Sequence, residues 1–162
     1  MVVRQYMKRT PIFIVVIIGI LQASAVDART DKLCKPLRAF AASIKPDEKR
    51  SLEFHTSWGG NFKDDPEPAI FAKRCTHYDY NPAKAVCTYL MEHGAIEFSN
   101  RNLQRALTCL SPKTRFDPDL SLNKADVSFS YGTEQRGSII NVSFDRDSST
   151  GGMVLKIDAD GY

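Results

Sequence analysis

Three histidines offer the side chains best suited to acid–base chemistry near neutral pH. His55 alternates with Glu53 and Ser57 along one face of a predicted strand, and His77 begins a loop rich in tyrosine. His93 lies at the end of a predicted helix, where the helix dipole favours a histidine, so we interpret it as structural. One functional hypothesis is therefore a small hydrolase of cell-envelope material that uses His55 or His77 as its base.

The local motifs that would support catalysis or a cofactor are absent from the sequence. There is no Gly-x-Ser-x-Gly nucleophile elbow, no glycine-rich phosphate loop before a helix and no His-Glu-x-x-His zinc motif. The acidic stretch 145–149 lacks the glycine and the distal glutamate of a calcium loop. The sequence therefore predicts no catalytic residue, no metal site and no cofactor.

The four cysteines are Cys34, Cys75, Cys87 and Cys109. None belongs to a Cys-x2-Cys pair, and this spacing argues against a zinc site. An even number of cysteines in an exported chain predicts two disulfides, with three possible pairings.

Export is indicated by residues 1–25, which have the three parts of a signal peptide. Positive charges at Arg4, Lys8 and Arg9 precede the apolar run 12–21, and an Ala-Ser-Ala sequence ends at Ala25. Because the apolar run is shorter than a membrane span, we expect cleavage after Ala25 and no membrane span afterwards. The mature chain, residues 26–162, is then one domain in the periplasm or outside the cell. An uncleaved N-terminal anchor is the alternative.

The charge balance also depends on the leader. The full chain has 22 lysines and arginines against 19 acidic residues, and three of the basic residues lie in the leader. The mature chain is thus formally neutral. A nucleic-acid partner is not expected, since binding to phosphates needs a basic surface.

Apolar periodicity, capping residues and helix breakers predict four helices in the first two thirds of the mature chain. Strict alternation of apolar and polar residues predicts one strand before the second helix and three strands in the last third. The expected helices are residues 31–44, 66–76, 82–93 and 99–110, and the strands 51–58, 126–131, 140–145 and 153–158.

Short turns between the last three strands predict an antiparallel meander, which the strand at 51–58 is expected to join. Because each strand has one apolar face, helices should cover that face and leave the other in water. The predicted fold class is therefore α+β, with two layers, an antiparallel sheet of about four strands and a helical cluster linked by disulfides.

This arrangement also favours one set of disulfides. If the helices at 66–76 and 82–93 run antiparallel about their loop, Cys75 lies opposite Cys87. The pair Cys34 with Cys109 follows by elimination.

The loop of His77, Tyr78, Asp79 and Tyr80 is the main candidate for a binding surface. Tyrosines in a loop next to a disulfide form a rigid contact surface, and tyrosine is enriched at binding hot spots. The alternative is that one tyrosine packs inward and the loop only connects two helices.

His55 and Ser57, on the polar face of the sheet, extend this candidate surface. Together with the missing catalytic motifs, the surface predicts an exported protein that binds another protein, such as an inhibitor or immunity partner of a toxic enzyme. An envelope assembly subunit is a third hypothesis.

Overall fold

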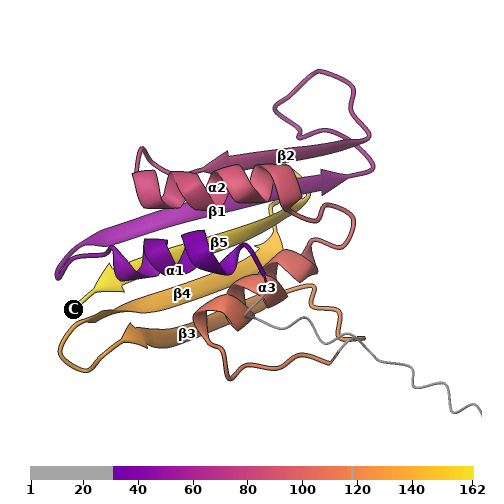
Figure 1. The fold of residues 1–162 in the computed structure, drawn as a ribbon. Coiled ribbons are helices and arrows are strands. Elements are labelled where there is room, and N and C mark those ends of the chain that lie inside the picture. Colours follow the sequence, from indigo (N-terminus) through magenta and orange to yellow (C-terminus); the bar gives the residue numbers. More distant parts are fainter. Residues whose placement is uncertain (1–30, 118) are drawn as a thin grey trace, which may run out of the picture.

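A computed structural model describes residues 31–117 and 119–162. The predicted signal peptide, residues 1–25, lies outside the described residues. The described chain forms a five-stranded antiparallel sheet whose strand order is β2-β1-β5-β4-β3, with helices on one face (Figure 1). The helices are α1 (Cys34–Ala42), α2 (Asn81–His93) and α3 (Asn100–Leu110), and the strands are β1 (Lys49–Trp58), β2 (Phe71–Thr76), β3 (Ala125–Gly132), β4 (Gly137–Arg146) and β5 (Met153–Gly161).

The core lies between the sheet and the helices, as the alternation predicts. Leu52 and Phe54 of β1, Leu155 and Ile157 of β5 and Phe144 of β4 are at most 2% exposed. They pack against the apolar sides of α1, α2 and α3 in a single buried cluster. The α+β fold class is thus confirmed, as is the β3-β4-β5 meander with β1 added next to β5. Within the described ranges, none of the helices has the length and apolarity of a membrane-spanning segment.

The helix expected at 66–76 is wrong, and this segment supplies the fifth strand instead. Asp65 does accept a hydrogen bond from the Glu67 N–H at 3.1 Å, as a capping residue would. However, Pro68 follows two residues after Pro66, and a proline disfavours the helical conformation of the residue before it, here Glu67. Residues 71–76 instead pair with β1 from Trp58 to Glu53. Pairing with a distant strand has overridden the local helical spacing.

The two disulfides are Cys34–Cys109, which links α1 to α3, and Cys75–Cys87, which links β2 to α2. The Cα atoms of these pairs are 4.8 and 5.5 Å apart. These are the pairs that the sequence favours, although the expected packing of two helices around Cys75 is replaced by a strand beside a helix. Two disulfides indicate an exported protein in an oxidising compartment.

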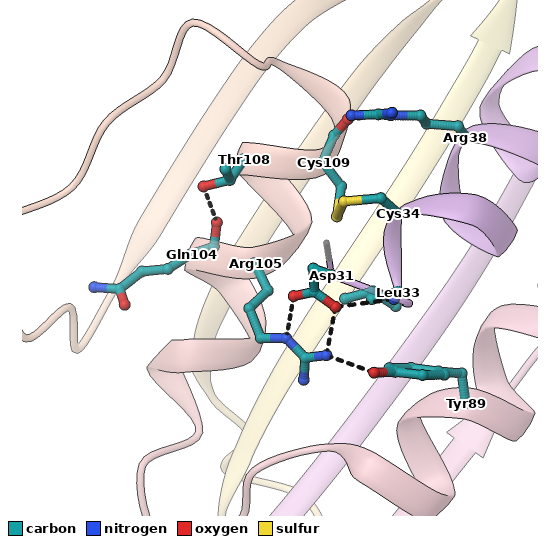
Figure 2. The surroundings of a disulfide bond; sticks show 9 residues. All are labelled: Asp31, Leu33, Cys34, Arg38, Tyr89, Gln104, Arg105, Thr108 and Cys109. Atoms are coloured by element: carbon teal, nitrogen blue, oxygen red, sulfur yellow. Dashed lines mark hydrogen bonds and ion pairs between the residues drawn. A yellow bond between two sulfur atoms is a disulfide. The ribbon is translucent and has the colours of Figure 1, made fainter. Parts of the chain in front are cut away.

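An ion pair near the first disulfide holds the three helices together (Figure 2). The Arg105 Nε and Nη2 atoms lie 2.6 and 2.8 Å from the two carboxylate oxygens of Asp31. Arg105 Nη2 also donates a hydrogen bond to the Tyr89 hydroxyl at 2.9 Å. The hydrogen bond from Arg105 lowers the pKa of Asp31 and raises that of the guanidinium. The start of α1 is thus fixed against α2 and α3.

Candidate functional site

The loop between β2 and α2 has an unusual backbone. Tyr78 and Asp79 both have positive φ, 47° and 55°, in the left-handed region that favours glycine. Each such residue costs about 1–2 kcal/mol unless local hydrogen bonds compensate, and such conformations are enriched at functional sites, although Asp47, in the turn before β1, also has positive φ. The Cys75–Cys87 disulfide closes the chain around this loop. The Tyr80 N–H donates a hydrogen bond to the His77 carbonyl at 2.9 Å, so residues 77–80 form a hydrogen-bonded turn whose two central positions, which favour glycine or asparagine, hold Tyr78 and Asp79.

Tyr80 holds the loop to the helical layer. Its ring meets Phe40 of α1 edge to face, with centroids 6.1 Å apart, and the Arg50 guanidinium stacks on it at 4.6 Å. Its hydroxyl is 2.8 Å from the Ser43 Oγ. Tyr80 is thus an anchor, as the alternative of one inward-packing tyrosine predicts.

Tyr78 points the other way and is 57% exposed. Partial burial of its hydroxyl group, followed by the charge of Glu53, raises the pKa of Tyr78. Lys156 acts in the opposite direction, and Asp158 adds a smaller effect of the same sign as Glu53. Tyr78 therefore lies against the sheet face that carries no helices, which we call the open face.

Beside Tyr78 the edge of β1 is uncovered. β2 pairs with β1 only from Glu53 to Trp58, because the chain leaves the sheet after Thr76. Residues 49–52 pair with β5 on one side and with no described strand on the other. A depression of about 190 Å³ occupies this place, lined by Lys49, Arg50, Ser51, Tyr78 and Tyr80.

A second depression, of about 170 Å³, continues from the first across the sheet. It shares Lys49, Arg50 and Ser51 with the first and adds Asn141 of β4 and the β5 residues 158–160. We refer to the two depressions together as the β1 groove. The β5 part of the groove was not predicted, because the apolar alternation predicts a strand that ends at Asp158, whereas β5 continues to Gly161. The pairing of Lys49 with Asp160 makes this extension necessary.

Charged groups near the β1 groove are mostly paired, with one imbalance. Lys49 pairs with Asp160 at 2.7 Å, and Arg50 pairs with Glu48. Two other carboxylates, Glu53 and Asp158, share the single ammonium of Lys156 at 3.4 and 3.7 Å. Glu53, Asp158 and Lys156 together carry one net negative charge, whereas the lining of the groove itself has two basic and two acidic side chains.

His55 and Ser57, two of the predicted binding-surface residues, lie on the open-face side of β1, where other parts of the chain cover most of their surface. Ser57 is buried at 7% exposure, and the His55 side chain is 12% exposed. Segment 59–70 folds over this part of the sheet, and the buried Phe62 meets the His55 ring edge to face at 6.4 Å. The backbone N–H of Lys63 donates a hydrogen bond to the Thr150 carbonyl at 2.8 Å, and this bond holds the segment against the β4–β5 turn.

Both nitrogens of His55 face carboxylates. Nδ1 is 3.3 Å from Asp147 and Nε2 is 3.5 Å from Glu53, and Nδ1 has no hydrogen bond within the described residues. Asp147 is strongly held as the anion by hydrogen bonds from Ser149 and Thr150, which lower its pKa. Neither depression of the β1 groove includes a histidine. The geometry thus gives His55 charged neighbours on both sides and places it outside the β1 groove.

The other two histidines lie elsewhere. His77 is partly buried, and its Nδ1 atom likewise lacks a hydrogen bond within the described chain. His93 is not in the core, since its side chain is 47% exposed and stacks on Tyr89 with ring centroids 4.7 Å apart. Across residues 31–117 and 119–162, no group of histidine, cysteine and acidic residues is arranged to hold a metal ion.

Comparisons with known proteins add no relative. No protein-family model, curated protein or solved structure matches this chain.

Proposed function

We propose that this exported protein acts by binding another protein through Tyr78 and the β1 groove. The observation that carries the proposal is the strained loop, in which Tyr78 and Asp79 are held at positive φ while Tyr80 anchors the loop and Tyr78 remains exposed. Residues other than glycine that are held in sparsely populated backbone conformations cluster at functional sites. An exposed, rigidly held tyrosine next to a groove is a common form of binding hot spot.

The compartment follows from two features taken together. The disulfides require oxidising conditions, and the leader at 1–25 predicts export through the inner membrane or secretion. We therefore place the partner in the periplasm or outside the cell, where an inhibitor or immunity protein would meet a toxic enzyme. The hydrolase hypothesis gains no support from the histidines, since the β1 groove contains none of them.

The test uses a matched pair of aromatic substitutions. Tyr78 and Phe98 are 57% and 54% exposed, and Phe98 lies between α2 and α3, outside the β1 groove. Oxidised protein is immobilised and exposed to an envelope extract of the source cells, and bound proteins are identified by mass spectrometry. A partner retained by wild type and Phe98→Ala, and lost with Tyr78→Ala, supports the proposal.

The captured partner must then bind the purified protein directly. Loss of a dominant hot spot should weaken that binding by about 2 kcal/mol or more, roughly thirtyfold. Equal binding by wild type and Tyr78→Ala would contradict the proposal.

A further inference from the structure

The backbone of β1 in the groove is oriented toward solvent. Glu48 accepts a hydrogen bond from the Gly161 N–H at 2.9 Å, and these residues lie opposite each other next to the pair Lys49 and Asp160. Hydrogen-bonded pairs alternate along an antiparallel ladder, so the amides of Arg50 and Leu52 face β5. The N–H and C=O groups of Lys49 and Ser51 consequently face away from β5, on the side where β2 is missing.

The β2 side of the ladder agrees with this assignment. Gly59 donates its N–H to the Ile70 carbonyl at 2.9 Å. Residues at odd positions of β1 therefore bond toward β2 wherever β2 is present, from Glu53 onward. At Lys49 and Ser51 the outward-facing N–H and C=O groups continue this pattern, but no strand within residues 31–117 and 119–162 pairs with them. An unpaired strand edge of this kind is a template for another extended chain.

The geometry points to an extended segment of the partner protein that adds to the sheet at Lys49 and Ser51, in line with β2. This inference rests on the proposed function and specifies how the partner enters the groove. The added segment bonds to the outward N–H and C=O groups, and its side chains alternate between the open face and the Tyr80 side.

Charge complementarity specifies one side chain of that segment. A residue opposite Ser51 lies on the open face, where the small Ser51 side chain separates it from Asp158 of β5, whose carboxylate accepts a hydrogen bond from the Ser51 hydroxyl at 2.5 Å. Glu53 and Asp158 share Lys156, so these three side chains together carry one net negative charge, and the exposed Tyr78 side chain interacts with Glu53. A long arginine or lysine side chain of the partner segment would form a charge-assisted hydrogen bond with these carboxylates and a cation–π contact with the Tyr78 ring.

The probe is a displayed library of linear ten-residue peptides, selected on the oxidised protein and counter-selected on Tyr78→Ala. Enriched peptides are expected to contain an arginine or lysine within a run of strand-forming residues. Peptide affinity is then compared for Ser51→Ala, which keeps the amide, and Ser51→Pro, which removes it. A proline is tolerated at an edge position whose N–H faces solvent. We expect Ser51→Pro to weaken binding by about tenfold and Ser51→Ala by less than about threefold.

Hydrogen exchange on the wild-type protein provides a readout that needs no variant. Bound peptide should slow exchange of the Lys49 and Ser51 amides at least about tenfold, while the already bonded Arg50 and Leu52 amides change little. If Tyr78-dependent peptides are unaffected by Ser51→Pro and leave these amides unprotected, strand addition is wrong and the proposed function stands. If the enriched peptides lack basic residues, the charge assignment is wrong. If no Tyr78-dependent peptide is enriched, both the inference and the proposed function are contradicted.

Discussion

Replacement of Arg105 by methionine should lower the free energy of unfolding by about 2–3 kcal/mol. The variant loses both charge-assisted bonds to Asp31 and the bond to the Tyr89 hydroxyl. It leaves the Asp31 carboxylate, whose side chain is only 7% exposed, with the single N–H of Leu33 at 2.9 Å. Removal of one partner of a fully buried ion pair costs about 3–5 kcal/mol. The expected loss is smaller here because the Arg105 side chain is 22% exposed, so water screens part of the interaction.

The assay is urea unfolding followed by far-ultraviolet circular dichroism, with both disulfides intact. Arg101→Met is the matched control, because Arg101 belongs to the same helix and its guanidinium lies over the exposed Phe98 ring at 4.9 Å. It should cost less than about 1 kcal/mol. In the double variant Asp31→Asn/Arg105→Met, part of the lost stability should return, since the unpaired charge is gone. A loss below about 1 kcal/mol for Arg105→Met, or an equal loss for Arg101→Met, would refute this account of the helical layer.

Three further results are expected. Removal of the Cys34–Cys109 disulfide, which has a sequence separation of 75, should lower the free energy of unfolding by roughly 4.5 kcal/mol. Removal of Cys75–Cys87, with a separation of 12, should lower it by about 3 kcal/mol. Denaturation of the two double-alanine variants measures both losses, and the reverse order would contradict the loop-closure argument. Asp79→Gly should raise the free energy of unfolding by up to about 1 kcal/mol, because glycine adopts positive φ without strain. A clear loss of stability in the same denaturation assay would show instead that the Asp79 side chain compensates for that strain. The pKa of Asp31 is lowered in the folded protein, so its contribution to stability is fully present above the unfolded pKa of about 4 and is lost as the pH falls toward the folded pKa. Between pH 5 and 2, the free energy of unfolding should therefore depend less on pH for Asp31→Asn than for wild type. An identical pH dependence of the two proteins would count against the ion pair.

The strands of the C-terminal third could be predicted because each carries an unbroken apolar alternation that matches its buried face. Ile140, Val142 and Phe144 are all buried, and the turns between strands are short. The helix predicted at 66–76 is wrong because its signals are only local. Its capping Asp65 and apolar spacing are local signals, whereas its conformation is set by pairing with β1, a contact that no local pattern reveals.

The candidate site could be predicted only in part. The tyrosine loop was found from composition and its neighbouring cysteines, but the opposite directions of Tyr78 and Tyr80 depend on packing against Phe40. His55 was expected in solvent because alternation assigns a face and says nothing of what covers it. The cover comes from Phe62 in segment 59–70, which is held by a bond to the β4–β5 turn. The uncovered edge of β1 follows from strand lengths, which sequence patterns define poorly.

The most direct test of the central claim is site-specific photo-crosslinking in the source cells. A photoreactive phenylalanine analogue replaces Tyr78 in one variant and Phe98 in another, two positions of similar exposure. We expect irradiation to join the position-78 variant to one protein of the envelope or the extracellular medium, and the position-98 variant to give no such product. The same products from both positions, or none from position 78, would contradict a binding role for the Tyr78 surface.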